Sequence, residues 1–174
     1  MSTHGASPQN PGHQNPGHPI AGRPWDAAAI RAIVAGHEAL EGPLLPILHA
    51  VQGAFGHIPR DAEPIIADAL NLTRAEVHGV ISFYHDFRSA PAGRHVLKLC
   101  RAEACQSMGA EANAERLLAA LGLDWGGTTP DGRLTVEPVY CLGLCATAPS
   151  ALLDEMPVAR LTAERLEQIA MEAA

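Results

Sequence analysis

The sequence predicts an α+β protein in which a helical bundle precedes a small α/β domain. Over residues 24–90, apolar residues recur at helical spacing in short segments that Gly and Pro separate. After Pro91 the pattern changes to apolar runs of strand length, which alternate with amphipathic segments. We therefore divide the chain into a polar tail (1–23), a helical bundle (24–90) and an α/β domain (91–174).

The first segment, residues 1–23, consists mostly of Gly, Pro, Ser, Asn, Gln and His. The pentapeptide Gln-Asn-Pro-Gly-His occurs in it twice in tandem, at 9–13 and 14–18. So polar a stretch cannot bury enough apolar surface to offset the entropy lost on ordering. The sequence therefore predicts a disordered, solvated tail.

Four helices are predicted in the bundle from start and stop signals. They span about 27–40, 44–55, 61–70 and 74–84. Asp26 is placed to cap the first helix, and Gly42-Pro43 ends that segment. Thr73 and Glu76 form the pattern of a capping box at the start of the fourth. Four short helices with brief connections are typical of a small bundle.

Three aromatic residues lie at the end of this helical segment. Phe83, Tyr84 and Phe87 recur at helical spacing, which is more often a core pattern than a docking surface or an electron route. We therefore expect them in the core of the bundle.

The second half contains strand and helix signals in alternation. The predicted strands are 94–99, 134–139, 151–153 and 158–160, and the predicted helices are 107–121 and a terminal helix capped by Thr162. Ser107 is the expected cap of the first of these helices, and Asp131-Gly132 is a hairpin turn signal. This order of elements describes a small α/β sandwich.

The four cysteines fall into two tight pairs, each at the end of a strand-like run. Cys100 and Cys105 have C-x4-C spacing, and Cys141 and Cys145 have C-x3-C spacing with Gly143 between them. Four thiolates that converge on one point bind a metal or an iron–sulfur cluster in a reducing cytosol. We expect all four cysteines to be ligands of one cluster.

Structural zinc is the main alternative for four cysteines. Zinc sites usually contain C-x2-C pairs, so the wider spacings favour an iron–sulfur cluster, although spacing alone does not decide between iron and zinc. Two disulfides are disfavoured because the N-terminus lacks the basic region and apolar core of a secretory signal. A redox dithiol is disfavoured because no C-x-x-C occurs.

The surroundings of the cysteines predict how a cluster would be stabilised. Cys105 lies just before the helix expected to start at Ser107, whose partial positive charge would favour a thiolate. Arg94, Lys98 and Arg101 lie close to the first pair in sequence and would offset part of the negative charge of the cluster. Such an offset raises the reduction potential.

Composition excludes several classes of function. The formal net charge of −7 argues against binding to nucleic acid, because phosphates attract clustered Lys and Arg. No apolar run approaches the roughly 20 residues that span a bilayer. With no secretory signal either, we expect a cytoplasmic protein without a membrane span.

The cysteine segments resemble a known family. Residues 141–149, Cys-Leu-Gly-Leu-Cys-Ala-Thr-Ala-Pro, are similar to the C-x-G-x-C-x-x-A-P signature of the thioredoxin-like [2Fe–2S] ferredoxin family, and Cys100 and Cys105 match its first cysteine pair. Residues 44–52 and 79–87 resemble its helical N-terminal segment. The resemblance implies a helical bundle followed by a thioredoxin-like domain with one [2Fe–2S] cluster. Such folds often place a cis-proline near the active loop, where Pro149 stands.

The resemblance also implies a function and partners. Residues 100–109 are most similar to the gamma subunit of soluble NAD-dependent formate dehydrogenases, with complex I and NAD-linked hydrogenases as alternatives. The implied role is that of an electron-transfer subunit with no catalytic residue of its own. Its expected partners are a flavin subunit on the NADH side, which binds FMN and NAD, and a larger catalytic subunit. An interaction module held together by zinc is the alternative from a different class.

Overall fold

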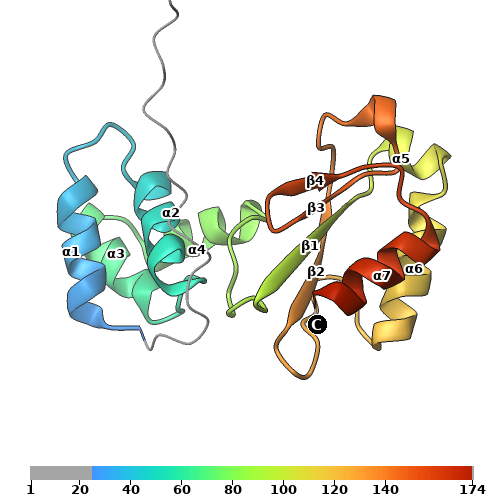
Figure 1. The fold of residues 1–174 in the computed structure, drawn as a ribbon. Coiled ribbons are helices and arrows are strands. Elements are labelled where there is room, and N and C mark those ends of the chain that lie inside the picture. Colours follow the sequence, from blue (N-terminus) through green and yellow to red (C-terminus); the bar gives the residue numbers. More distant parts are fainter. Residues whose placement is uncertain (1–24, 174) are drawn as a thin grey trace, which may run out of the picture.

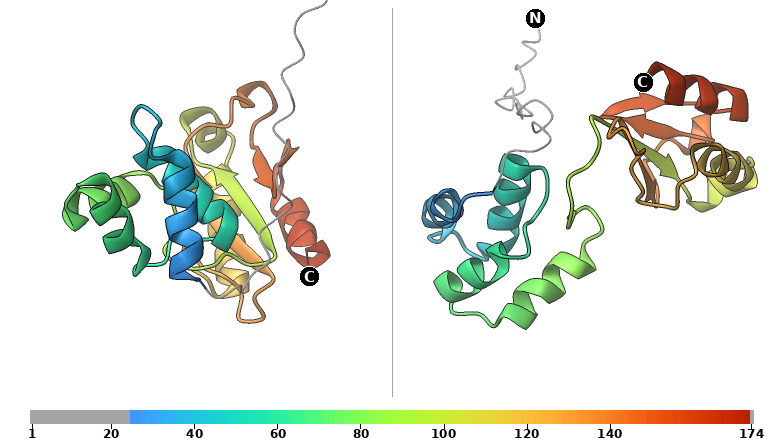
Figure 2. Two further views of the ribbon diagram at one scale, coloured as in Figure 1. Left: turned by 90° about the vertical axis from the view of Figure 1, so that its left-hand side faces the viewer. Right: turned by 90° about the horizontal axis from the view of Figure 1, so that it is seen from below.

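The computed structural model describes residues 25–173, which form a helical lobe and a sheet lobe (Figures 1 and 2). Each lobe has its own hydrophobic core. The tail predicted for residues 1–23 lies outside the described residues. The α+β fold class is confirmed, since helices and a four-stranded sheet are both present.

The helical lobe contains the four expected helices. They are α1 (Ala27–His37), α2 (Leu44–Phe55), α3 (Ala62–Leu70) and α4 (Arg74–Phe83). The Asp26 side chain caps α1 by accepting a hydrogen bond from the Ala28 N–H (3.0 Å). Thr73 and Glu76 form the expected capping box at the start of α4. α1 ends three residues before its predicted end at 40.

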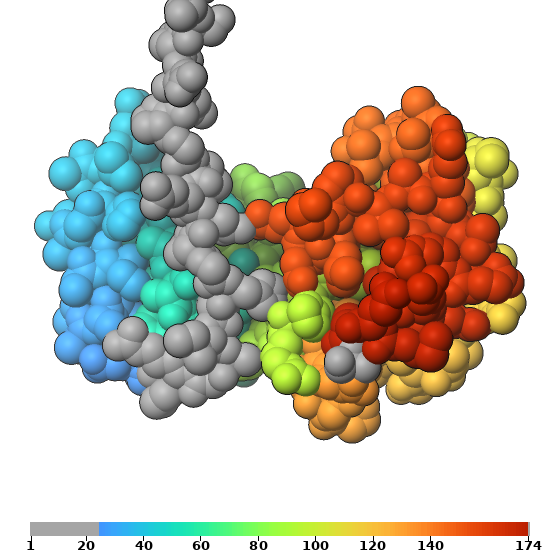
Figure 3. Space-filling model, viewed as in Figure 1, coloured from blue at the N-terminus to red at the C-terminus, as the bar shows by residue number. Residues whose placement is uncertain are grey.

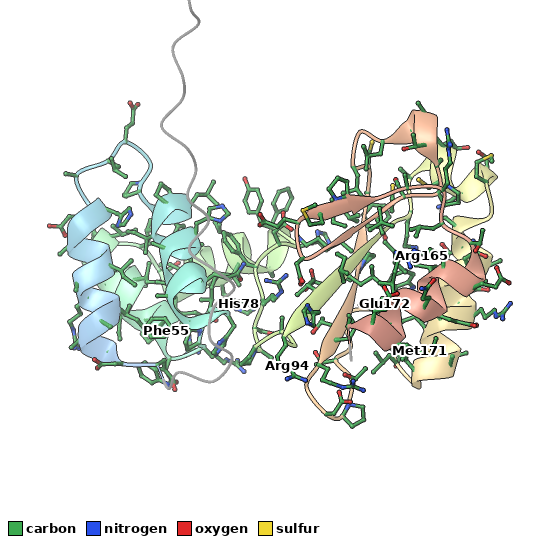
Figure 4. The ribbon with its side chains drawn as sticks, viewed as in Figure 1. Phe55, His78, Arg94, Arg165, Met171 and Glu172 are labelled. Atoms are coloured by element: carbon green, nitrogen blue, oxygen red, sulfur yellow. The ribbon has the colours of Figure 1, made fainter. Side chains whose placement is uncertain are left out.

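The core of this lobe is built from the apolar faces of all four helices. Its buried members are Ile30, Val34, Ile47, Leu48, Val51, Phe55, Ile58, Ala62, Ile66, Ala67, Val77 and Phe87. Phe55, labelled in Figure 4, is only 2% exposed. One acid is buried as well: Glu63 on α3 contacts Arg74 Nε (3.3 Å) and His78 Nδ1 (3.1 Å) on α4. A buried carboxylate requires such partners, so this cluster joins the two helices.

The expectation for the three aromatic residues was wrong in two cases. Phe87 is buried, but Phe83 is 73% exposed and Tyr84 is 43% exposed. Their rings contact each other edge to face, with centroids 5.1 Å apart. Phe83 is the last residue of α4 and Tyr84 is its C-cap, so no further turn of the helix follows these two residues.

The sheet lobe contains β1 (His95–Cys100), β2 (Leu134–Val139), β3 (Ala151–Leu153) and β4 (Met156–Val158), in the order β2-β1-β3-β4. β1 and β2 are parallel, with Cys100 opposite Val139, and the other pairs are antiparallel. Parallel strands end at the same edge of a sheet. The loops that carry both cysteine pairs therefore emerge side by side.

The turn predicted at Asp131-Gly132 is present, because the Arg133 N–H donates to Asp131 Oδ1 (3.1 Å). Its N-terminal arm forms no regular strand; it is joined to β2 by the bridge between Thr128 and Thr135 and by backbone hydrogen bonds of residues 126–129. The last strand lies at Met156–Val158 instead of 158–160. The Ala148–Pro149 bond is cis, as expected.

Helices cover one face of the sheet, seen at the right of Figure 1. They are α5 (Glu103–Ser107), α6 (Ala110–Leu121) and α7 (Ala163–Glu172), and a 3-10 turn, η1, spans Cys145–Thr147. The buried core beneath them comprises Leu97, Leu99, Ala114, Leu117, Leu118, Leu134, Val136, Ala151, Leu161, Leu166, Ile169 and Ala173. None of the helices within residues 25–173 is both long and apolar enough to cross a membrane.

The helix predicted for 107–121 is observed as α6, which begins three residues later, and the short helix α5 that precedes it was not predicted. The break lies at Gly109, whose φ of +83° is a left-handed conformation that favours glycine. Ser107 is the last residue of α5 and caps nothing; its hydroxyl donates to the Ala104 carbonyl (2.9 Å). The prediction that Ser107 caps a helix was therefore wrong.

The segment between the lobes is held from both sides. The Gln52 side chain on α2 donates to the Asp86 carbonyl and accepts from the Arg88 N–H, both at 2.7 Å. Arg88 in turn forms a two-pronged ion pair with Glu137 on β2, at 2.6 and 3.0 Å. This Gln52–Arg88–Glu137 chain connects the two lobes, which Figure 3 shows in blue-green and in orange-red.

Arg88→Ala is expected to lower the free energy of unfolding by about 1–2 kcal/mol. Both side chains of the pair are only about one-fifth exposed, so Glu137 would lose its partner in a poorly solvated position. Chemical denaturation provides the measurement. The control is Arg133→Ala, which breaks the more exposed pair with Asp131 and should cost less than about 1 kcal/mol. Equal losses in both variants would contradict a connecting role for Arg88.

Candidate functional site

The two cysteine pairs meet at the edge where β1 and β2 end. Cys100 is the last residue of β1, and Cys105 lies within α5, which follows it. Cys141 comes two residues after the end of β2, and Cys145 is the first residue of η1. All four are free cysteines, so the structure brings the predicted set to one end of the sheet as thiols.

Cys100 lies at the centre of this group. Burial acts to raise the pKa of its thiol, but backbone N–H groups of Ala102, Cys141 and Leu142 and the Cys105 side chain hold the pKa below its usual value. Two of those N–H groups come from the second cysteine loop. This loop therefore contacts the first pair directly.

The thiols of the second pair also interact with each other and with the first pair. A hydrogen bond with Cys141 and the negative charge of that residue raise the pKa of the Cys145 thiol, and the charges of Cys105 and Cys100 act in the same direction. Because the four thiols interact in this way, ionisation of all four is unfavourable unless cations lie between them. A bound metal centre would relieve that repulsion.

The two pairs differ in exposure. Cys100 and Cys105 are 4% and 1% exposed, whereas Cys141 and Cys145 are exposed. The loop of the exposed pair is tightly turned: Cys141 has a φ of +88° and Gly143 a φ of +74°. Such a conformation is uncommon for a residue with a side chain, and strained residues of this kind cluster at functional sites. It brings the Gly143 N–H to 3.4 Å from the Cys141 sulfur.

We expected Arg94, Lys98 and Arg101 to offset the charge of the cluster, but the structure places none of the three as an unpaired charge beside the cysteines. Arg101 donates two hydrogen bonds to Glu111 (2.6 and 3.0 Å), and Lys98 pairs with Asp86 (3.1 Å). Arg94 precedes β1 and lies at the opposite end of that strand from Cys100 (Figure 4). Of these three cations, two are thus paired with acids of this chain and the third lies elsewhere.

The prediction that a helix begins just after Cys105 was also wrong. Cys105 is the third residue of α5, a helix of only five residues. We expected the helix to begin at Ser107, whereas α5 begins at Glu103. Cys105 therefore lies inside a short helix and not ahead of the N-terminus of α6.

One neighbour was missed by the sequence reasoning. Ser150 is buried, its hydroxyl oxygen lies 3.6 Å from the Cys105 sulfur, and its carbonyl accepts a hydrogen bond from the Cys100 N–H (3.1 Å). Its place directly after Pro149 carries no chemical signal in the sequence. Only the pairing of β3 with β1 brings it to the cysteines.

The residues present fit a [2Fe–2S] cluster. Such a cluster requires four thiolates and is stabilised by N–H groups directed at sulfur, and this site supplies both. Within residues 25–173, no three or more His, Cys, Asp or Glu side chains are arranged as a site for a metal ion. The fit therefore rests on the chemistry of the donors.

The fold and the cysteine loops define a ferredoxin-type protein, a small α+β fold that presents thiolates at a sheet edge. Residues 30–174 match the family of thioredoxin-like [2Fe-2S] ferredoxins, and the chain belongs to that family. The family carries a [2Fe–2S] cluster, as the resemblance implied. This finding replaces the alternative of a zinc module.

Relatives of the chain come from several complexes. Subunit HndA of the NADP-reducing hydrogenase of Solidesulfovibrio fructosivorans is 33% identical over 132 residues, which cover 76% of this chain and 77% of HndA. Subunit 2 of the NADH-quinone oxidoreductase of Thermus thermophilus is 36% identical over 133 residues, which cover 76% of this chain and 74% of the relative.

Among solved structures, the chain is similar to the crystal structure of an NAD+-reducing [NiFe]-hydrogenase in the air-oxidized state. The TM-score is 0.62 at 29% identity, and the match covers 75% of this chain. It covers only 22% of the hydrogenase chain, so this protein corresponds to one part of a longer polypeptide there.

Proposed function

We propose that this protein is the electron-transfer subunit of an NAD-linked oxidoreductase, with one [2Fe–2S] cluster held by Cys100, Cys105, Cys141 and Cys145. The observation that carries the proposal is the parallel pairing of β1 and β2, which brings the two cysteine loops together. The names of its relatives, subunits of a hydrogenase and of an NADH-quinone oxidoreductase, support the class of complex.

The arrangement of the ligands suits transfer of single electrons. When bound, the cluster supplies a one-electron couple. Cys100, on a strand fixed between two others, and Cys105, in α5, would hold it from the buried side. Cys141 and Cys145 would hold it from the solvent side, where a partner can approach. The backbone N–H groups directed at the sulfurs stabilise negative charge without a proton being transferred.

The proposed partner is a flavin subunit that binds FMN and NAD, together with a larger catalytic subunit, and the complex is proposed to be cytoplasmic.

A groove of about 510 Å³ runs along the segment 83–92 and the end of β2. The exposed rings of Phe83, Tyr84 and Tyr140 line it, and its charged groups are already paired with one another. Exposed aromatic rings are typical anchors of protein interfaces.

The double variant Phe83→Ser/Tyr84→Ser is expected to weaken binding to the flavin subunit by at least about tenfold, because aromatic anchors dominate interface energies. Pull-down of the flavin subunit, followed by its FMN absorbance, measures the effect. Met171→Ser is the matched control, because Met171 is an exposed apolar residue on α7 (Figure 4). Unaltered binding by the double variant would refute this docking face.

We propose soluble NAD-dependent formate dehydrogenase as the parent complex, because residues 100–109 resemble its gamma subunit. Complex I and NAD-linked hydrogenase are the competing assignments. In the native complex, formate should reduce the cluster and produce its EPR signal. Reduction by hydrogen but not by formate would assign the protein to a hydrogenase instead.

The function itself is tested on anaerobically purified protein. We expect about two irons and two acid-labile sulfides per chain and an EPR signal that appears only after reduction with dithionite. Zinc without sulfide, and no signal in either state, would overturn the proposal.

A further inference from the structure

Ser150 is a buried residue whose hydroxyl points at a cluster ligand. It is 2% exposed and directly precedes β3. Its Oγ lies 3.6 Å from Cys105 Sγ, within hydrogen-bonding range for sulfur. Within the described part of the chain, this is the only hydrogen bond of the hydroxyl. Its backbone carbonyl meanwhile accepts from the Cys100 N–H (3.1 Å), so one residue contacts both buried cysteines.

The direction of this hydrogen bond follows from the chemistry of a ligand. Between a free thiol and a hydroxyl, either atom can donate. A cysteine that binds iron is a thiolate and has no proton to give. In the protein with its cluster, Ser150 must therefore be the donor and Cys105 the acceptor.

A hydroxyl donor here acts on the charge of the site. Reduction adds one negative charge, part of which resides on the cysteine sulfurs, and a fixed donor stabilises the reduced form more than the oxidised form. Lys98 and Arg101 are occupied by Asp86 and Glu111. Ser150 is a neutral donor placed to stabilise that charge on the buried side.

We propose that Ser150 is a positioning residue that orients the Cys105 thiolate and raises the reduction potential of the cluster through an O–H···S hydrogen bond. The inference rests on the proposed function, because it assumes a [2Fe–2S] cluster bound to Cys105. It concerns a residue outside the four ligands. A purely structural serine would change the stability of the protein and leave the potential unchanged.

The test is an EPR-monitored redox titration of the Ser150→Ala variant with its cluster bound. Loss of the donor is expected to disfavour reduction by about tenfold, which lowers the midpoint potential by about 59 mV for a one-electron couple. Thr135→Val is the matched control: Thr135 is equally buried, but its hydroxyl bonds the Gly93 N–H and Thr128 and no cysteine. Its potential should equal that of the wild type.

A second pair of variants separates the hydroxyl from packing. Ser150→Thr and Ser150→Val have the same shape and differ only in the hydroxyl group. The threonine variant should keep a higher potential than the valine variant, even if the alanine variant does not retain its cluster. Equal potentials in the threonine and valine variants would overturn the inference.

The failure of this inference is distinguishable from the failure of the proposed function. If the wild type contains neither iron nor sulfide, the proposed function fails and the inference fails with it. If the wild type contains the cluster but the hydroxyl does not affect its potential, only the role of Ser150 is refuted.

Discussion

Serine in place of Cys105 is expected to reduce the [2Fe–2S] content of the purified protein by more than about tenfold. Loss of groups that merely support a metal ligand already weakens metal binding about 10–100-fold, and here a ligand itself is replaced. Serine binds iron only as an alkoxide, which is harder to form in a site that is 1% exposed. Iron and sulfide analysis with EPR measures the loss. Serine variants of Cys100, Cys141 and Cys145 are expected to lose the cluster or shift its potential.

The control for this experiment is Met108→Leu. Met108 lies in the same segment and is exposed, and its thioether is no thiolate. The variant should retain its full cluster content and EPR signal. An intact cluster with an unchanged signal in all four serine variants would disprove the ligand assignment.

Leu97→Ala is expected to lower the free energy of unfolding by about 2–5 kcal/mol. Leu97 is fully buried in β1, opposite Val136 on β2 and Leu153 on β3. Removing its side chain leaves a cavity in the strand that ends at Cys100. Thermal or urea denaturation measures the change, and earlier loss of the cluster absorbance on heating should accompany it.

Leu40→Ala is the matched control for this variant. Leu40 is half exposed between α1 and α2, and its truncation should change stability by less than about 0.5 kcal/mol. A loss at position 97 no larger than that at position 40 would contradict the central place of β1 in the core.

Local structure was predictable because it depends on neighbours in the sequence. Asp26 and the Thr73–Glu76 pair cap α1 and α4 as predicted, since a cap needs only residues within one turn. The capping of α7 by Thr162 is confirmed in the same way. The boundaries assigned at residues 23 and 90 stay predictions.

The errors arose where distant groups compete for one residue. Lys98 and Arg101 are close to Cys100 in sequence, but Asp86 and Glu111 bind their charges in the fold. Phe83 and Tyr84 have the spacing of core residues, but they lie at the C-terminal end of α4 and remain exposed. No local pattern contains these ion-pair partners or shows which residues at the end of a helix stay exposed.

The sequence by itself determined the α+β class, most helices and their caps, the cysteine set and the family. The tertiary structure alone decided how the site is assembled. The parallel pairing of β1 with β2 places two loops 35 residues apart in the chain at one edge, and β3 brings Ser150 against Cys105. Strand pairing depends on contacts between segments far apart in the chain, so a cysteine spacing predicts the ligands but not the groups that surround them.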